Sequence, residues 1–289
     1  MRLINTRTRR LEFSPANSKL PLPKYAILSE SHAPGEDKAS SYPNLIQNPK
    51  SSNNRQNGNR EEDHQRLDKP CLLALSHGFE YIWIDTLCID HKNNADIAKA
   101  VKSTWKRLSR ASVCFVYLDD VSLLAQFLTS QWFTHTWTLP ALLAPPSVVF
   151  HNSSWEELGT KSSPSLCPII SRITGIPQSI LRGETSLHST SIAQKMSWAA
   201  RQKTPSTRPE DRAYSLMGLF GLEDDDNTLK IRYGEGFRRA FTRLQQGIIQ
   251  KFPDDHTIFA WRLSHSCEAE DGSLLAPSPR CFEASGRIV

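Results

Sequence analysis

Two apolar segments joined by an amphipathic helical pattern constrain the fold of this chain most. Residues 81–85 (YIWID) and 113–118 (VCFVYL) are nearly continuous in apolar and β-branched side chains, as in strands that are covered on both faces. Between them, apolar residues recur at helical spacing, at Ile97, Val101, Trp105 and Leu108. The order strand, helix, strand predicts a βαβ unit with a right-handed connection, and therefore a parallel sheet.

Further segments extend the predicted sheet and add a helical C-terminal portion. Residues 25–29 (YAILS) and 147–150 (SVVF) are short apolar runs that follow prolines and fit two more strands. Asn94 is placed to cap the helix of the βαβ unit. Beyond about residue 154 the pattern becomes helical, and we expect helices over 155–160, 165–174, 192–201, 209–220 and 234–249.

A polar stretch interrupts this pattern. Residues 38–69 are rich in Ser, Asn, Gln, Pro and charged side chains, and they contain too little apolar surface to offset the entropy of ordering. We expect most of the stretch to be flexible, with a helix resuming near Arg66. The tail after Arg262 is mixed and polar, and we expect it to be irregular.

The composition excludes several classes of protein. The chain has 289 residues and a net charge of +5, which is mild for this length and does not indicate a nucleic-acid-binding protein. No run approaches the roughly 18 apolar residues of a membrane-spanning helix, and the N-terminus lacks a secretory signal, so we expect a cytoplasmic protein without membrane contact. The six cysteines are scattered, which indicates buried free thiols without a metal site or a disulfide framework.

Candidate site residues lie in three segments, and each has a structural alternative. Asp85 and Asp90 follow a buried strand at the edge where open α/β sheets bind ligands, although aspartate at such a turn also caps helices or forms salt bridges. His135 could act as an acid or a base, because imidazole groups in general titrate near neutrality, but its aromatic-rich surroundings are typical of core packing. No GxGxxG, GxxxxGK[ST], HExxH or GxSxG motif is present, so the common nucleotide-binding, zincin and hydrolase signatures are missing.

The third segment is RPEDRAY, residues 208–214, together with YGEG at 233–236. Glu210 and Asp211 would lie in the first turn of a helix and complement its dipole. Arg212 would lie inside that helix and could pair with a carboxylate, and Glu235 stands between two glycines. A ligand-binding or catalytic site fits these residues. A structural ion-pair network and a glycine-shaped turn fit them as well.

Many separate segments stand in a distinctive order: MRLINTRTRRLEF, KYAILS, FEYIWIDTLCIDHKNNADIAKAV, SVCFVYLDDV, QWFTHTWTLPALLAPPSVVF, WEELGTK, ITGIP, SIAQKMSWAARQKTPSTRPEDRAYSLMGLFGL, YGEGFRRAFTRLQQGII and DDHTIFAWR. In this order they resemble the fungal heterokaryon-incompatibility (HET) domain. The match covers most of residues 1–262, so the polar stretch at about 38–69 is expected to be an insertion within one domain, and 263–289 an irregular C-terminal tail.

The resemblance implies a cytoplasmic fungal protein of allorecognition, which triggers growth arrest or programmed cell death when genetically different hyphae fuse. It implies an α/β fold that is TIR-like (flavodoxin-like), with a mostly parallel sheet, flanking helices and a helical C-terminal portion. Many TIR domains hydrolyse NAD, and a glutamate near the nicotinamide ribose assists through an oxocarbenium-like transition state. NAD is therefore the substrate that the resemblance suggests, and other incompatibility proteins or a second copy of the chain are the suggested partners.

Two motifs depart from the family pattern. Family members usually read LSHTWG after the first strand, whereas ESHAPGED follows Ser29 here. Members also usually read RGWTLQELLAP, and this chain has other residues at the Arg, Gly, Gln and Glu positions, namely His135, Thr136, Pro140 and Ala141. If that glutamate is the catalytic acid, its loss lowers the rate by about 100- to 10,000-fold.

Two hypotheses follow from these departures. In the first, the chain signals through protein contacts and its catalytic motifs are degraded. In the second, it is an active NAD glycohydrolase that uses another carboxylate, such as Asp85, Glu210 or Glu235.

Overall fold

One sheet organises the described part of the chain. The computed structural model describes residues 1–13, 22–30, 57–204, 206, 208–223, 229–263 and 273–289, and the side chains of the first long helix from Leu67 onward. The sheet has seven strands in the order β2-β1-β4-β3-β5-β6-β7. The strands are β1 (Arg2–Asn5), β2 (Leu11–Phe13), β3 (Tyr25–Glu30), β4 (Tyr81–Ile84), β5 (Val113–Tyr117), β6 (Val148–His151) and β7 (Glu157–Thr160).

The four central strands are parallel, as the apolar runs predict. β3 pairs with β4 and with β5, and β5 pairs with β6, all in parallel. Leu28 of β3 lies opposite Ile84 on one side and Phe115 on the other. The antiparallel strands β1, β2 and β7 complete the two edges, so the prediction of a mixed α/β fold with a mostly parallel sheet is confirmed.

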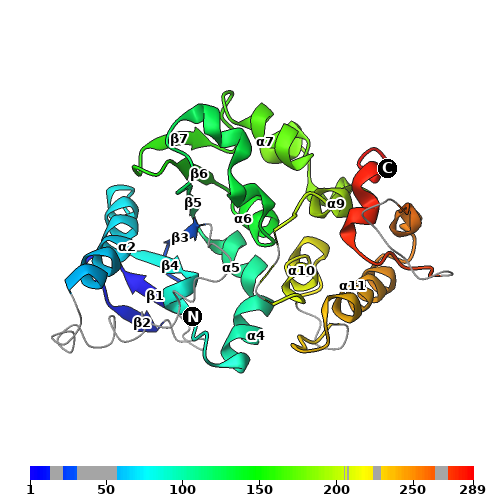
Figure 1. Cartoon of the computed structure of the whole chain (residues 1–289), viewed down its shortest axis with the longest axis horizontal. Coiled ribbons are helices and arrows are strands. Elements are labelled where there is room, and N and C mark those ends of the chain that lie inside the picture. The colour runs from blue at the N-terminus through cyan, green and yellow to red at the C-terminus, as the bar shows by residue number, and fades with distance from the viewer. Residues whose placement is uncertain (14–21, 31–56, 205, 207, 224–228, 264–272) are drawn as a thin grey trace.

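Helices cover both faces of this sheet. Figure 1 shows α2 on one side of the central strands and α5 and α6 on the other, while α9, α10 and α11 gather beyond α5. The α-helices are α2 (Asn57–Ser76), α3 (Asp85–Cys88), α4 (Asn94–Lys102), α5 (Thr104–Arg110), α6 (Thr138–Leu143), α7 (Cys167–Thr174), α8 (Gln178–Leu181), α9 (Ile192–Ala199), α10 (Asp211–Tyr214) and α11 (Phe237–Lys251). Short 3-10 helices are η3 (Leu124–Thr129), η4 (Gln131–Thr134), η5 (Leu187–Ser189), η6 (Gly218–Phe220), η7 (His256–Phe259) and η8 (Pro279–Ser285).

The predicted βαβ unit is present, but its connection contains three helices, α3, α4 and α5, rather than one. α4 ends at Lys102 and α5 begins at Thr104, with Ser103 between them. The N-cap is Asn93, whose side chain accepts hydrogen bonds from the backbone N–H groups of Ala95 and Asp96. The choice of Asn94 as the cap was therefore wrong by one residue, because two neighbouring asparagines offer the same capping group.

Two helices predicted in the C-terminal portion differ in the structure. Residues 157–160 form strand β7, which pairs with β6 in antiparallel register, so the helix predicted over 155–160 is wrong. Asn152 reverses the chain before it, because its Oδ1 accepts the N–H groups of Ser154 and Glu156. The segment 209–220 divides into α10 and η6 instead of forming one helix.

The polar stretch and the tail also contain more structure than their composition predicts. Helix α2 already begins at Asn57 and includes residues 57–69 of this stretch, whereas residues 38–56 lie outside the described residues. The tail contains η8, with Phe282 fully buried, and Ala276 exchanges hydrogen bonds with the buried side chain of Gln245 in α11. The expectation of an irregular tail is wrong for residues 279–285, because they form η8, which packs against α9.

The cysteines mostly follow the expectation. Cys71, Cys88, Cys114 and Cys167 are buried free thiols, and burial raises the pKa of Cys71, Cys88 and Cys114 to about 12. Cys281 differs, since its sulfur is disulfide-bonded.

None of the helices within the described ranges combines the length and the apolar character that crossing a bilayer requires.

Candidate functional site

The topology points to the carboxyl edge of the parallel strands as the place for a site. The chain runs from β3 to β4 on one side and then returns across β3 to β5 on the other. Ligands in open α/β sheets bind where the strand order reverses in this way, outside the carboxyl ends of the strands. Here that point lies between the ends of β3 and β5, next to the loops that follow β4 and β6.

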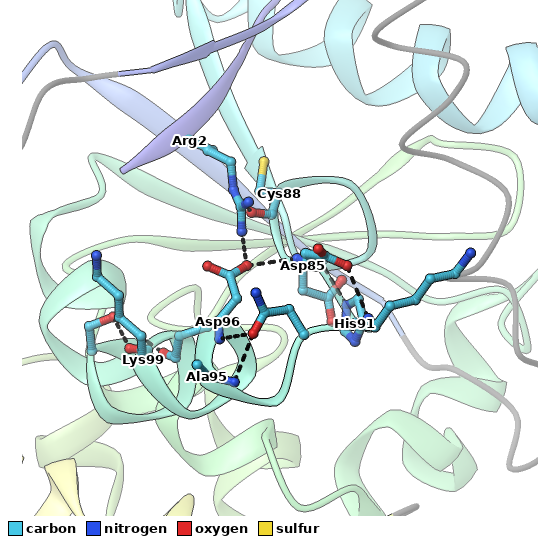
Figure 2. Close-up of polar contacts among 12 residues, drawn as sticks. Arg2, Asp85, Cys88, His91, Ala95, Asp96 and Lys99 are labelled. Carbon is cyan, nitrogen blue, oxygen red and sulfur yellow. Dashed lines mark hydrogen bonds and ion pairs between the residues drawn. The ribbon is translucent and has the colours of Figure 1, made fainter.

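The loop after β4 carries Asp85 and Asp90, and it is fixed by residues that are distant in sequence (Figure 2). Arg2 of β1 donates from Nε to the carbonyl of Cys88 at 2.7 Å and from Nη2 to the carboxylate of Asp96 in α4. Asp96 Oδ2 also accepts the backbone N–H of Asp90 at 2.8 Å. One arginine and one aspartate therefore tie β1, the loop and α4 together.

The two candidate aspartates make local backbone contacts in this loop. Asp85 is the first residue of α3, and its Oδ1 accepts the N–H of Thr86 at 2.7 Å. Asp90 Oδ1 accepts the N–H of Lys92 at 3.0 Å and shapes the turn before α4. The contact of Asp90 is of the kind that the turn interpretation predicts. Asp85 does not cap α3, because the N-cap is Ile84 and makes no side-chain capping hydrogen bond.

The aromatic-rich segment before α6 packs into the core above β3 and β6. Trp132, Phe127 and Phe133 surround Phe150 with ring centroids 5.1 to 6.1 Å away. The indole of Trp132 donates to Ser29 Oγ at the end of β3 over 3.1 Å. The packing interpretation of this segment is thus confirmed, and His135 lies directly after it as the C-cap of η4.

Helix α6 presents no carboxylate at the position where the family usually has glutamate. Ala141 is only 4% exposed and belongs to the hydrophobic core. Pro140 occupies the first turn of α6. The backbone N–H groups of a first turn have no acceptor within the helix, so a proline there removes no helical hydrogen bond. The substitutions at Pro140 and Ala141 therefore fit the helix without visible distortion.

A buried lysine, Lys161, lies at the carboxyl end of α6. Lys161, which follows β7, donates to the carbonyls of Leu142 and Pro145 at 3.0 and 2.7 Å. Burial lowers the pKa of its ammonium to about 8. A cation at the carboxyl end of a helix complements the helix dipole, so Lys161 holds the end of α6 in place.

The remaining candidates, Glu210, Arg212 and Glu235, surround α10 and the start of α11. Glu210 is 3% exposed, and its Oε1 accepts the N–H groups of Gly234 and Gly236 at 2.8 and 2.9 Å. Both glycines have positive φ, which this turn requires. The Arg212 guanidinium lies 4.2 Å from the centre of the Phe237 ring.

Glu235 takes part in the same network. Its Oε1 accepts the hydroxyl of Tyr214 at 2.7 Å and Nη1 of Arg243 at 2.5 Å. Together with Glu210, it fastens the 233–236 turn to α10 and α11. The contacts are those of the structural ion-pair interpretation.

Asp211, which the sequence indicates only as a first-turn residue beside Glu210, is buried next to this network. Asp211 accepts the hydroxyl of Tyr233 at 2.9 Å, and burial raises the pKa of its carboxyl to about 6. Arg208 lies over the Tyr233 ring at 4.4 Å and donates to Asn94 Oδ1 at 3.1 Å. Arg208 thus connects the α10–α11 network to the first turn of α4.

The structure distributes the predicted site residues over three places. Asp85 and Asp90 lie in the loop after β4, His135 precedes α6, and Glu210, Arg212 and Glu235 belong to the α10–α11 network. Sequence reasoning missed Arg2, Asp96 and Lys161, and it did not foresee the contact of Asp211 with Tyr233, because most of these partners lie too far along the chain to produce a local pattern. Within the described ranges, no group of three or more His, Cys, Asp or Glu side chains is placed to hold a metal ion.

His151, at the carboxyl end of β6, should make the protein sensitive to acid. It is 2% exposed, and its Nδ1 has no hydrogen-bond partner among the described residues. Burial, with a smaller effect of His77, lowers the pKa of His151 from 6.5 to about 4. The folded protein therefore binds fewer protons than the unfolded chain between these pH values, and its stability falls as the pH drops through this window.

Replacing His151 with phenylalanine should remove this sensitivity. Proton uptake by His151 in the unfolded chain should lower the free energy of unfolding of the wild-type protein by about 2 kcal/mol at pH 5 relative to pH 7.5. The His151→Phe variant should not show this loss. Urea unfolding at both pH values measures the difference, with the exposed His188→Phe variant as the control. Equal acid sensitivity of His151→Phe and the wild-type protein would contradict the assignment.

Comparison with known proteins gives one informative relative. The chain is 35% identical over 238 residues to the vegetative incompatibility protein HET-E-1 of Podospora anserina, and the match covers 78% of this chain and 16% of that protein. The chain therefore spans about a sixth of the length of that relative. No family model and no solved structure matches the chain.

Proposed function

Because the chain belongs to the fungal heterokaryon-incompatibility family, we propose that it acts in vegetative incompatibility as a cytoplasmic signalling protein that leads to cell death. Its similarity to HET-E-1 carries this proposal. In the proposed mechanism the chain works through contacts with other incompatibility proteins or with a second copy of itself. The domain responsible is a HET domain over residues 1–262.

The geometry around α6 supports a mechanism without catalysis. Ala141 places a methyl group in the core where the family usually has a carboxylate. Glu210 and Glu235, which could replace that carboxylate, are held by backbone N–H groups, a tyrosine and an arginine. A carboxylate that supports a turn through such contacts is poorly placed to stabilise a reacting sugar.

The strand order supports a TIR-like, flavodoxin-like fold as part of the proposal. Numbered along the chain, the parallel strands β3, β4, β5 and β6 stand in the spatial order 2-1-3-4. Flavodoxin-like sheets begin with this order.

Inducible expression in a fungal host tests the biological role. We expect colony growth to stop after induction of the wild-type chain and to continue after induction of a Gly218→Val variant, whose fold is disrupted. Normal growth with soluble, folded wild-type protein would contradict the role in incompatibility.

The alternative function is an active NAD glycohydrolase. The position of Asp85 at the carboxyl end of β4 favours it, because that edge is where ligands of such sheets bind. The alternative predicts release of nicotinamide from NAD by the purified chain and loss of that activity in Asp85→Asn. The proposed signalling mechanism predicts no release above the rate without protein.

A further inference from the structure

Arg212 is a candidate site residue that has no anionic partner in the structure. The sequence allows it to pair with a carboxylate, but its guanidinium lies over the Phe237 ring, 4.2 Å from the ring centre. This guanidinium donates no hydrogen bond and forms no ion pair within the described part of the chain. The neighbouring carboxylates of Glu210 and Asp211 accept hydrogen bonds from the turn before α11 and from a tyrosine instead.

A second arginine, Arg280 of η8, lies close to Arg212. Burial lowers the pKa of the Arg212 guanidinium, and the positive charge of Arg280 lowers this pKa further. Both residues are half-buried, and the guanidinium of Arg280 has no hydrogen-bond or ion-pair partner among the described residues. By contrast, Arg2, Arg9 and Arg243 each form an ion pair with a carboxylate. The two neighbouring arginines therefore carry two positive charges that no described side chain compensates.

The elements that carry these arginines are fixed against each other. Helix α10 packs against α11, and Figure 1 shows the C-terminal segment, in red, next to α11. Before Arg280, two hydrogen bonds of 2.9 and 3.0 Å join Ala276 to Gln245 of α11. After it, the carbonyl of Cys281 accepts the N–H of Arg262 at 2.9 Å. A ligand that contacts both guanidinium groups would meet an arrangement that is already ordered, which lowers the entropic cost of binding.

The chemistry of the pair indicates which ligand it binds. Charges that are partly removed from water are costly unless an opposite charge compensates them. Guanidinium groups donate hydrogen bonds in a planar fork that matches phosphate oxygens, and a phosphate monoester carries up to two negative charges. A single carboxylate would compensate only one of the two arginines. Helix α11 adds to the positive potential, because residues 237–251 contain four basic side chains and no acidic one.

We propose that Arg212 and Arg280 form a binding site for the phosphate group of a small ligand. The ligand is inorganic phosphate or a small phosphate monoester, which share the same dianionic group. A compact ligand fits this place, because a half-buried guanidinium offers only part of its surface. The bound phosphate connects α10 to the C-terminal segment and so stabilises the helical C-terminal portion. This inference goes beyond the proposed function and does not depend on it.

Thermal unfolding of the whole chain in a phosphate series at constant ionic strength tests the proposal. The melting temperature of the wild-type chain should rise with the phosphate concentration, because a ligand that binds the folded state stabilises it. In isothermal titration calorimetry, the Arg280→Gln and Arg212→Gln variants should raise the dissociation constant at least about tenfold, because each loses charge-assisted hydrogen bonds. Arg182→Gln is the matched control. Arg182 pairs with Glu184 elsewhere, so this variant should bind phosphate like the wild type.

The stability of the variants without phosphate distinguishes a binding site from a structural role. In phosphate-free buffer, Arg280→Gln should melt at or above the temperature of the wild-type chain, because it removes the repulsion between the two guanidinium groups. A lower melting temperature would show that Arg280 supports the fold and would overturn the proposal. If Arg212→Gln unfolds, Arg212→Lys repeats the test, since it keeps the positive charge and should still bind phosphate more weakly without the planar fork.

A comparison of ligands identifies the source of the phosphate. Tighter binding of glycerol 1-phosphate than of inorganic phosphate would support a monoester, and the reverse order would support the free ion. Acetate, a monoanion, should leave the melting temperature unchanged at the same ionic strength. A chain that does not respond to phosphate, arginine variants that bind it like the wild type, or tighter binding of the dicarboxylate succinate than of either phosphate would each overturn the proposal.

Discussion

Replacing Gly218 with alanine is expected to lower the free energy of unfolding by about 3 kcal/mol. A Cβ added at Gly218 would lie 2.1 Å from Trp105 Cβ and 2.8 Å from Glu223 Oε2. Trp105 belongs to α5 beside the sheet, and Gly218 begins η6 in the C-terminal portion. Since the contact is between main-chain-proximal atoms, rotation of a flexible side chain cannot relieve it, and α5 and η6 must move apart.

Urea unfolding of the variant and the wild-type chain measures this cost. Gly183→Ala is the matched control, because a Cβ at Gly183 would meet no heavy atom within 4 Å, although its φ of +75° is left-handed. That strain should cost only about 1 kcal/mol. Equal losses in the two variants would show that the approach of α5 to η6 is not as tight as described.

Replacing Glu210 with alanine is the second change with a large expected effect. The side chain accepts two backbone N–H groups of the 233–236 turn, and hydrogen bonds to a charged acceptor contribute about 1.5 to 3 kcal/mol each. We therefore expect a loss of about 3 kcal/mol, because the turn that begins α11 loses its attachment to α10.

The ionisation of Glu210 determines how the loss of stability in Glu210→Ala depends on pH. Burial disfavours its ionised form, but the N–H groups of Gly236 and Gly234 and the charge of Arg208 hold the pKa of the carboxyl below its usual 4.5. Because the pKa of Glu210 is lower in the folded protein than its usual 4.5, the ionised carboxylate stabilises the fold at pH values above 4.5. This contribution is lost as the pH falls. The difference between wild type and Glu210→Ala should therefore shrink in acid.

Two further variants distinguish the effect of losing the hydrogen-bond acceptor at Glu210 from the effect of losing a negative charge. Glu210→Gln keeps an oxygen that can accept the two N–H groups and should lose less stability than Glu210→Ala. Glu184→Ala removes an exposed carboxylate whose ion pair with Arg182 spans 3.8 Å, and it should change stability by no more than about 0.5 kcal/mol. A Glu210→Ala variant that is as stable as Glu184→Ala would contradict the structural role.

The sequence predicts the centre of this fold better than its edges. The strands at 81–85 and 113–118 can be predicted from the local run of apolar residues alone, and both are parallel strands at the expected places. β7 has no such signal, because its four residues are partly exposed and become a strand only by pairing with β6. β1 and β2 likewise depend on long-range pairing, since β1 completes the sheet through contacts with β4.

The candidate residues show the same limit. Sequence reasoning located the acidic segment at 208–214, but it could not show that Glu210 binds glycine N–H groups 24 and 26 residues away. Arg2 has no local pattern at all, because its partners Cys88 and Asp96 are 86 and 94 residues away. Chemistry that is assembled from distant segments requires the tertiary structure.

In the proposed mechanism the chain signals in incompatibility without consuming NAD. The most direct test is to express the wild-type chain and a Pro140→Gln/Ala141→Glu variant in a fungal host, and to measure colony growth and cellular NAD in the same cultures. We expect the wild-type chain to arrest growth while NAD stays at the level of uninduced cells. A fall in NAD that precedes arrest, or arrest only in the variant with the restored glutamate, would contradict the account.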